Sequence, residues 1–465
     1  MPKSQRTSSR PAHHANGTAT SFINPWPSAG LPTWTEVFQS SFPFGWYNKA
    51  SLHSHRRARK IKVVKPDWGH PKQVQAQPGE SSGKSKPQSF TATWLGHAGA
   101  LVEIPPIQQP DEDGGSTTLS GESKSKSTYL LFDPIFSTRA GPTQYQGVAR
   151  FKEPPCQIAD LPGCDAVFIS HSHYDHLDVS SVKAVFKRFP NARYFVPLGI
   201  KSWILATIKI SKDQVIELDW WQDRELQLSD LELPASGECS GIQEVQQRGS
   251  NDTTDNKITL KVSCVPAQHN SGRSPADQGS TLWCGWVIEC FWQPSQGLSE
   301  IKTESPRTRI GSIYHAGDTG YRRHSNPNSP ICPIFETIGS RFGPLDLCFL
   351  PIWRGGSLGF ISYMGLRLSH HDIPAALHAS PTDAADMHLA VKARNTVGVH
   401  FGTFVGSENE TVEAVVEFAD ACDARSIGWL DDNKGGEEEK IVSAEDDKGW
   451  AGVLDIGESF VVDLL

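Results

Sequence analysis

The stretch DAVFISHSHYDHLD, residues 165–178, decides how this chain is interpreted. Its first six residues form an apolar run, which predicts a buried strand leading straight into a group of histidines. The potential ligands that follow are His171, His173, Asp175 and His176. On a strand or helix these side chains cannot all point the same way, so they converge only if the chain turns sharply and a helix begins just after. Neutral imidazoles and a carboxylate are natural zinc ligands; a histidine-rich surface loop is the alternative.

Three further candidate ligands stand far along the chain, each at the end of another apolar run. His269 follows KITLKVSCVPAQ, Asp318 follows RIGSIYHAG and His400 follows TVGV. Each run predicts a strand, and a sheet edge can deliver the side chains that follow its strands to one place. Taken singly, a lone histidine is usually a surface or satisfied core residue, and an aspartate before Thr-Gly is usually a turn former. Together with the histidine cluster, the three predict one site.

HSHYDHLD resembles the signature of the metallo-β-lactamase superfamily, and further blocks narrow the resemblance. They are similar to blocks of the N-acylphosphatidylethanolamine-hydrolysing phospholipase D group and its bacterial and fungal relatives. In chain order they are INPWP (23–27), TWLGHA (93–98), DPIF (133–136), PAQHNSGRS (266–274), LWCGW (282–286), AGDTGY (316–321), FGPLDL (342–347) and VHFGTF (399–404). The resemblance implies an α+β fold, the four-layer αβ/βα sandwich of the metallo-β-lactamases, with polar loop insertions.

The resemblance also implies a centre of two Zn²⁺ ions. The first ion would be held by His171, His173 and His269, and the second by Asp175, His176 and His400, with Asp318 bridging the two. Two zinc ions a few ångströms apart lower the pKa of a shared water, which gives hydroxide at neutral pH, and they polarise a phosphoryl or carbonyl oxygen. The implied reaction is phospholipase D-type cleavage of N-acylphosphatidylethanolamine to phosphatidic acid and an N-acylethanolamine.

Three residues are candidates for direct catalytic roles: Asp175, Asp318 and His378. Asp175 would orient the attacking water or take its proton, and Asp318 would stand between the ions. His378 lies 22 residues before His400, the same offset as a family histidine near the substrate phosphate. It would bind the phosphate or assist the leaving group; a position on the surface is the alternative.

Other histidines leave these assignments open. His370 and His371 compete with His378, because the segment 354–377 is longer than the family pattern. His97, in a Gly-His-Ala turn, is either an outer partner of a metal ligand or a structural turn residue.

Composition excludes some classes of protein. With a net charge of −8 and a pI near 6.1, the chain lacks the broad basic face that a nucleic-acid binder needs. Its nine cysteines are scattered and form no CxxC pair, which indicates reduced thiols in an intracellular protein. No apolar run approaches the ~18 residues of a membrane span. We expect a cytoplasmic protein or one peripheral to an internal membrane, with a mitochondrial location left open.

We expect one large domain with attached polar segments. The predicted boundaries are a disordered tail over 1–20, an aromatic and basic segment over 21–66, a linker over 67–89 and the metallo-β-lactamase-like domain over 90–465. Polar tracts at about 105–127, 236–257 and 293–308 fall between strand-like runs, so they are interpreted as loops on one scaffold.

Two features bear on substrate and partners. Aromatic residues between Trp34 and Tyr47 precede the basic run RRARKIKVVK (56–65), a combination that suits a membrane interface with anionic lipid. The alternative is that the aromatics pack on the sheet and the charges form a solvated face. The expected partners are a phospholipid substrate and a peripheral membrane surface, with no nucleic acid and with a homodimer left open. Pro275-Ala276 and WRGGSLGF (353–360) depart from the family pattern beside the pocket, so the lipid that is hydrolysed stays open.

Two alternative functions are considered. A hydrolase of another phosphodiester or of a lactone would use the same scaffold. A zinc-stabilised binding protein without turnover is disfavoured, because a structural zinc site rarely needs two ions and an open coordination position.

Overall fold

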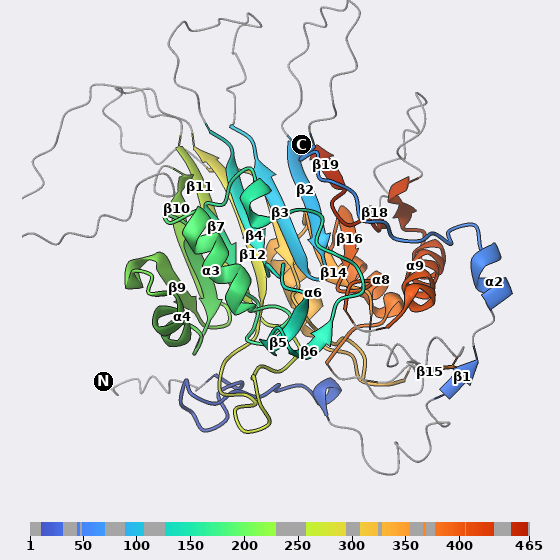
Figure 1. The fold of residues 1–465 in the computed structure, drawn as a ribbon, viewed down its shortest axis with the longest axis horizontal. Helices are drawn as coiled ribbons and strands as arrows, with labels where there is room; N and C mark the ends of the chain where they lie inside the picture. Colours follow the sequence, from blue (N-terminus) through green and yellow to red (C-terminus); the bar gives the residue numbers. More distant parts are fainter. Residues whose placement is uncertain are drawn as a thin grey trace, which may run out of the picture.

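A computed structural model shows two mixed β-sheets that face each other, with helices on their outer sides (Figure 1). The residues that it describes are 11–30, 44–46, 49–69, 89–106, 126–228, 257–293, 307–323, 328–353, 366–368, 377–404, 406–431 and 448–463. Within these ranges, none of the helices has both the length and the apolar character to cross a bilayer.

The first sheet has seven strands in the order β19-β2-β3-β4-β7-β8-β9. Their bounds are β2 Ser89–Gly96, β3 Gly99–Ile104, β4 Thr128–Phe132, β7 Ala166–Phe168, β8 Arg193–Pro197, β9 Val215–Leu218 and β19 Ser459–Asp463. Successive side chains face opposite sides of the sheet. Phe168 and Phe195 enter the core between the sheets, whereas Val167 and Val196 belong to a second core under helices. Because both faces of β7 and β8 are covered, the central residues of these two strands are apolar on either side.

The second sheet has eight strands in the order β10-β11-β12-β13-β14-β16-β18-β17. Their bounds are β10 Asp223–Gln227, β11 Lys257–Val265, β12 Gly285–Gln293, β13 Thr308–His315, β14 Leu347–Pro351, β16 Asn395–Val399, β17 Gly428–Trp429 and β18 Trp450–Gly452. Three of them, β11, β13 and β16, contain the apolar runs noted above, and with β14 they end on the same side of the sheet.

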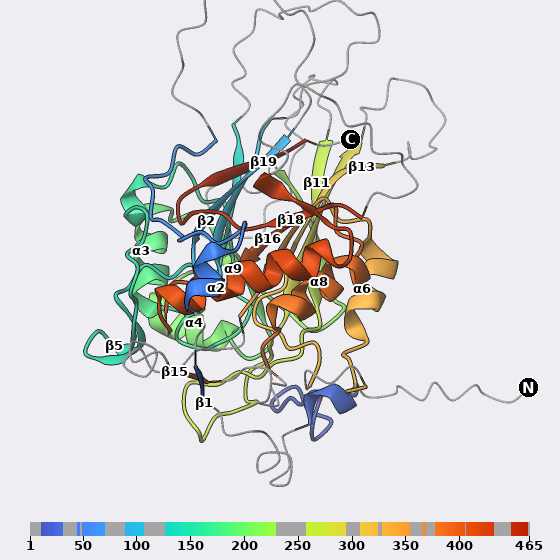
Figure 2. The same ribbon diagram turned by 90° about the vertical axis from the view of Figure 1, so that its right-hand side faces the viewer.

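Helices cover the outer faces and complete the four layers. α3 (Val179–Arg188) and α4 (Lys201–Ile208) lie on the first sheet, and α6 (Ile334–Phe342), α8 (Pro381–Ala390) and α9 (Glu408–Asp423) lie on the second (Figures 1 and 2). The predicted αβ/βα sandwich is therefore confirmed.

Smaller elements surround this frame. α2 spans Lys49–Ser54, and three short 3₁₀ helices span Pro27–Ala29 (η1), Ile158–Asp160 (η2) and Lys212–Gln214 (η3). β5 (Arg139–Thr143) and β6 (Gln146–Ala149) form a hairpin, and β1 (Phe44–Trp46) pairs with β15 (Leu366–Leu368).

Residues 11–20, expected to be a disordered tail, are instead packed against the domain. His13 is buried and its ring nitrogen Nε2 donates a hydrogen bond to Asp219. Phe22, just beyond, is 3% exposed and lies in the main core. This polar segment is ordered because His13 and His14 both contact the carboxylate of Asp219 and Phe22 packs in the main core.

The basic run that follows is also partly used within the molecule. Arg59 lies within ion-pair distance of Asp431, Asp455 and Glu458, and Ile61 is buried in the main core. Arg59 thus forms ion pairs within the domain and is not part of a freely solvated face. Most of the predicted linker (70–88) and of the three polar tracts (107–125, 229–256 and 294–306) lies outside the described residues.

The topology gathers several loops at one end of the sandwich. The β2–β3 turn and the loops after β4, β7, β11, β13 and β16 all leave the sheets there. Carboxyl ends of parallel strands are where α/β proteins place their ligand sites. All the candidate ligands predicted from the sequence lie in these loops.

Candidate metal centre

The chain turns sharply after β7, as the clustered histidines require. The backbone N–H groups of His176 and Leu177 both donate to the carbonyl of His173. Asp178 then begins α3 by accepting a hydrogen bond from the backbone N–H of Ser181. This tight turn brings the four ligand candidates of the segment to one side.

The first group of ligand atoms consists of three imidazoles. Nδ1 of His173 lies 2.9 Å from Nε2 of His171 and 3.2 Å from Nε2 of His269. The Nδ1–H of His269 donates to the carbonyl of Leu377 at 2.9 Å, which leaves Nε2 without a proton and facing the group. A ligand atom from each of the three lies within 4.8 Å of the others.

The second group combines one carboxylate with imidazoles. Oδ2 of Asp175 lies 3.7 Å from Nε2 of His176 and 3.8 Å from Nε2 of His400. His97 donates to the same oxygen at 2.8 Å, so it partners a predicted ligand; it also has a left-handed backbone, so both predicted roles for it hold. His400 has φ of 61°, which is uncommon outside glycine. Such strain is typical of functional sites.

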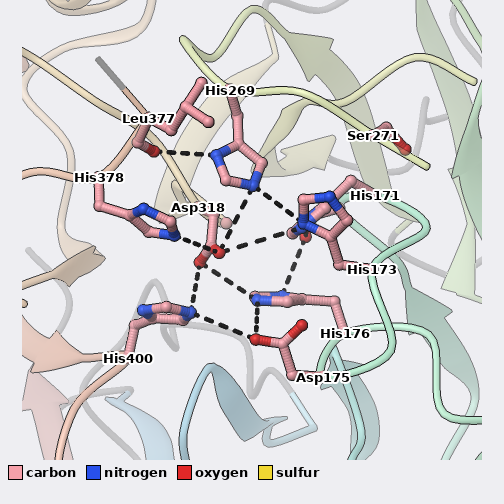
Figure 3. A network of polar contacts seen from close by, with 12 residues as sticks. His171, His173, Asp175, His176, His269, Ser271, Asp318, Leu377, His378 and His400 are labelled. Carbon is pink, nitrogen blue, oxygen red and sulfur yellow. Dashed lines mark hydrogen bonds and ion pairs between the residues drawn. The ribbon is translucent and has the colours of Figure 1, made fainter. Parts of the chain in front are cut away.

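Asp318 lies between the two groups and turns one oxygen toward each (Figure 3). Its Oδ1 is 3.2 Å from Nε2 of His176 and 2.9 Å from Nε2 of His400. Its Oδ2 is 3.6 Å from Nε2 of His269. The structure therefore brings together all seven residues that the sequence predicted as ligands.

Buried polar atoms in this cluster lack ordinary partners. Nε2 of His176, Nε2 of His400 and Oδ1 of Asp318 are buried, and the oxygen lies 3.2 and 2.9 Å from the two nitrogens, yet none of them meets a described residue with hydrogen-bond geometry. Buried polar groups are rarely left unsatisfied, and such exceptions call for a ligand or an ion. The geometry and the donor set fit divalent metal ions.

The pKa shifts of the ligand candidates also indicate a site for metal ions. Burial lowers the pKa of His171 and of His269 well below the usual value, so both imidazoles are neutral, the form that binds metal. Burial alone would raise the pKa of Asp318, but the neighbouring His176 and His400 hold it well below its ordinary range. Although burial opposes it, Asp318 in turn raises the pKa of His400 to about 9. The buried carboxylate thus draws positive charge, which a divalent ion would supply.

A cavity of about 370 Å³ opens beside the second group. His378 stands on its wall with a side chain 31% exposed, and its Nε2 lies 3.3 Å from Oδ2 of Asp318. Most of the remaining wall is apolar, formed by Ala140, Val148, Tyr174, Trp353 and Phe404. His378 thus reaches both the centre and the cavity, whereas its competitors His370 and His371 lie outside the described residues.

The segments that depart from the family pattern differ in their relation to this cavity. Trp353 lines it, and the rest of 353–360 lies outside the described residues. Pro275 and Ala276 are exposed and are absent from the described lining.

Two residues that support the centre were not predicted from the sequence. Asp133 accepts hydrogen bonds from the Nδ1–H of His176 at 2.8 Å and from the backbone N–H of Ser170 at 2.7 Å, which orients His176. Asn24 donates to the backbone carbonyl of His269. Both residues lie in blocks noted above, DPIF and INPWP, but nothing in a linear sequence says which side chain they contact.

The chain is similar to several known proteins. Residues 128–401 match a family model described as the beta-lactamase superfamily domain. The N-acyl-phosphatidylethanolamine-hydrolyzing phospholipase D 1 of Caenorhabditis elegans is 28% identical over 336 residues, 72% of this chain and 70% of the relative. The mitochondrial enzyme of the same description from Saccharomyces cerevisiae is 26% identical over 428 residues, 88% of this chain and 74% of the relative.

Solved structures were compared as well. A metallo hydrolase from the archaeon Ignicoccus hospitalis aligns with 15% identity and a TM-score of 0.39, over 80% of this chain and 98% of the other.

Proposed function

Because this chain belongs to the β-lactamase superfamily, we propose that it is a zinc-dependent phosphodiesterase that cleaves N-acylphosphatidylethanolamine to phosphatidic acid and an N-acylethanolamine. The general part of this proposal, that the chain is a hydrolase of the metallo-β-lactamase type, follows from the family. The observation that carries the finer part is Asp318, whose two oxygens face two separate groups of ligand atoms beside an apolar cavity. The relatives in worm and yeast support the lipid substrate.

The proposed cofactors are two zinc ions held by residues of the two groups. His171, His173 and His269 would hold one, Asp175, His176 and His400 the other, and Asp318 would contact both. When bound, such ions lower the pKa of water and polarise a phosphoryl oxygen. Because Nδ1 of His176 donates to Asp133 and Nδ1 of His269 to Leu377, each ring is held with Nε2 free, the atom that would bind an ion.

The chain's own residues would direct the substrate and the protons. Asp175, held by His97 and 28% exposed, faces the cavity and would orient the attacking water. That water adds its oxygen to phosphorus, the bond from phosphorus to the ethanolamine oxygen breaks, and the departing oxygen takes a proton. His378 would place the phosphate or supply that proton, since its ring stands between Asp318 and the open cavity.

We place the proposed membrane surface at the same end of the molecule. Ala140 and Val148 of the β5–β6 hairpin line the cavity, and Tyr145 at the hairpin tip is 93% exposed. An exposed aromatic beside an apolar opening suits the membrane–water interface. We expect Tyr145→Ser to weaken sedimentation with phospholipid vesicles while hydrolysis of a water-soluble phosphodiester is kept. Unchanged sedimentation would remove the hairpin from the contact.

The decisive experiment is hydrolysis of purified N-acylphosphatidylethanolamine in water enriched in ¹⁸O, with products identified by mass spectrometry. The proposal requires the label in phosphatidic acid and none in the N-acylethanolamine, because water attacks phosphorus. Diacylglycerol as the product, or label in the amide alcohol, would contradict it.

Two parallel substrates separate the alternatives. Turnover of a lactone or of another phosphodiester, with the lipid left intact, would favour a different hydrolase on the same scaffold. Protein that holds metal and releases nothing from any of the three would favour a binding protein.

A further inference from the structure

A further group of potential metal ligands lies where the N-terminal segment meets the end of β9, and it shares no residue with the central groups. Nε2 of His13 lies 2.7 Å from Oδ1 of Asp219, and Nε2 of His14 lies 2.9 Å from Oδ2. One ligand atom from each of the three residues lies within 4.8 Å of the others. Asp219 directly follows the last residue of β9, so a rigid sheet fixes one side of the group.

The surroundings hold these side chains in place. The ring of His13 stacks on Trp220 with 4.2 Å between centroids, and the His14 ring stands nearly perpendicular to it. The backbone N–H of Trp220 donates to Oδ1 of Asp219 at 2.8 Å, which orients the carboxylate. The three side chains are only 8–12% exposed, so the group is buried yet still reached by solvent at its edge.

We propose that His13, His14 and Asp219 bind one divalent transition-metal ion of the zinc class. Two imidazoles and a carboxylate are a common ligand set for such ions. Ligand bonds of about 2.0–2.2 Å hold neighbouring ligand atoms ~3 Å apart. The separations of 2.7 and 2.9 Å between the imidazole nitrogens and the two carboxylate oxygens are close to that, and one ligand atom from each residue lies within 4.8 Å of the others. Each neutral imidazole then carries its proton on Nδ1 instead of on the Nε2 that faces Asp219, and water completes the coordination from the solvent side.

The ion would act on the N-terminal segment, which the group ties to the domain. The backbone N–H of Ile23 donates to the carbonyl of His13, so residues 13–23 form one folded unit. Directly beyond it, Asn24 donates to the carbonyl of His269, and the hydroxyl of Ser28 donates to Oε1 of Gln268. The ion would therefore stabilise a segment that supports the loop carrying a ligand of the central site. This role is additional to the proposed hydrolysis and does not depend on it.

The test is the zinc content of the full chain, measured after equilibration with zinc and removal of the unbound metal. His13→Gln combined with His14→Gln should hold about one zinc ion per chain less than the wild type. The matched control is His53→Gln with His55→Gln, two histidines of the same N-terminal region that lie outside the group. That control should keep the wild-type content. Zinc is kept in large excess during equilibration so that the central site is filled in every variant, and the difference then reports the N-terminal group.

A second variant tests whether the loss of zinc could come from unfolding instead of from the lost ligands. Asp219→Asn keeps the size of the side chain but removes the charge that binds the ion, and it should show the same loss of about one zinc ion. In the wild type, zinc should also slow proteolytic removal of residues 1–30, and it should not do so in Asp219→Asn. Equal zinc content in the wild type and Asp219→Asn would overturn the proposal and leave the group as a set of hydrogen bonds.

Discussion

The side-chain amide of Asn24 donates a hydrogen bond of 2.6 Å to the backbone carbonyl of His269, across 245 positions of sequence. The imidazole of His269 is fixed as well, because its Nδ1–H donates a hydrogen bond to the carbonyl of Leu377. Main chain and side chain of one candidate ligand are thus each fixed by a different segment.

We expect Asn24→Ala to lower the zinc affinity of the central site by about 10- to 100-fold, the usual effect of losing an outer partner of a ligand. The lost bond frees the loop that carries His269. The measurement is zinc affinity by competition with a chromophoric chelator. Asn395→Ala is the matched control, since Asn395 also donates to a backbone carbonyl, that of Asp346, but far from the ligands. An equal loss of affinity in both variants would show a general loss of stability instead.

A second prediction concerns Asp133, the carboxylate behind His176. Asp133→Ala removes the acceptor that fixes the proton of His176 on Nδ1 and leaves the backbone N–H of Ser170 unpaired. We expect about a 10- to 100-fold loss of metal affinity, together with a lower free energy of unfolding because a buried donor loses its partner. Asp165→Ala tests the second effect alone, because Asp165 accepts from the backbone N–H of Tyr129 without contacting a ligand. Intact zinc binding in Asp133→Ala would refute the orienting role.

The clustered ligands could be predicted because all four lie within one short stretch of sequence, residues 171–176. Four potential ligands within six residues after an apolar run leave few arrangements other than a sharp turn into a helix, and the turn and α3 follow that expectation. The distant ligands His269, Asp318 and His400 were predictable because each ends an apolar run, and the strands β11, β13 and β16 run in the same direction.

Other parts could not be predicted, for physical reasons. The partners of Asp133 and Asn24 depend on register between strands and on the path of the N-terminal segment, which no local pattern encodes. Residues 11–20 read as a polar tail, yet they are ordered because Asp219 and Trp220, some 200 positions away, supply the contacts of His13. The binding of two zinc ions remains a prediction from donor type and spacing.

Removal of metal gives a third prediction. Chelation should abolish hydrolysis and lower the midpoint of thermal unfolding, since ions that bind only the folded chain stabilise it. Added zinc should restore both. In Asp318→Asn, which loses the carboxylate facing both ligand groups, chelator should lower the midpoint less than in the wild type, because the central site binds little metal to begin with. Hydrolysis that persists after the metal is shown to be gone would contradict a metal-dependent mechanism.

His378 provides a fourth prediction, which separates a role in the reaction from metal binding. His378→Ala should reduce kcat by about 10²- to 10⁴-fold, the range for a lost proton donor, while zinc content stays at the wild-type value. His370→Ala and His371→Ala serve as controls, because the sequence left these two histidines as competitors for the role. Loss of kcat in either control with His378→Ala fully active would move the assignment to the 354–376 segment.

The last prediction concerns Gly317, the residue before Asp318. Its φ of 60° lies in the left-handed region, and a Cβ built on it would lie 2.6 Å from Cβ of Ser170 and 3.0 Å from the carbonyl of Cys284. Gly317→Ala therefore costs about 1–2 kcal/mol for the backbone conformation alone, and the overlap with Ser170 adds to it. The loop can relieve this overlap only by shifting, and the shift would move Asp318 away from the histidines. We expect a lower thermal midpoint and reduced zinc content.

In the control Gly30→Ala, the nearest atom to the new Cβ lies at 3.4 Å and φ is −59°, so both measurements should match the wild type. Wild-type stability and zinc content in Gly317→Ala would mean that the loop tolerates a side chain there, and that Asp318 is not held by the close packing of Gly317 against Ser170.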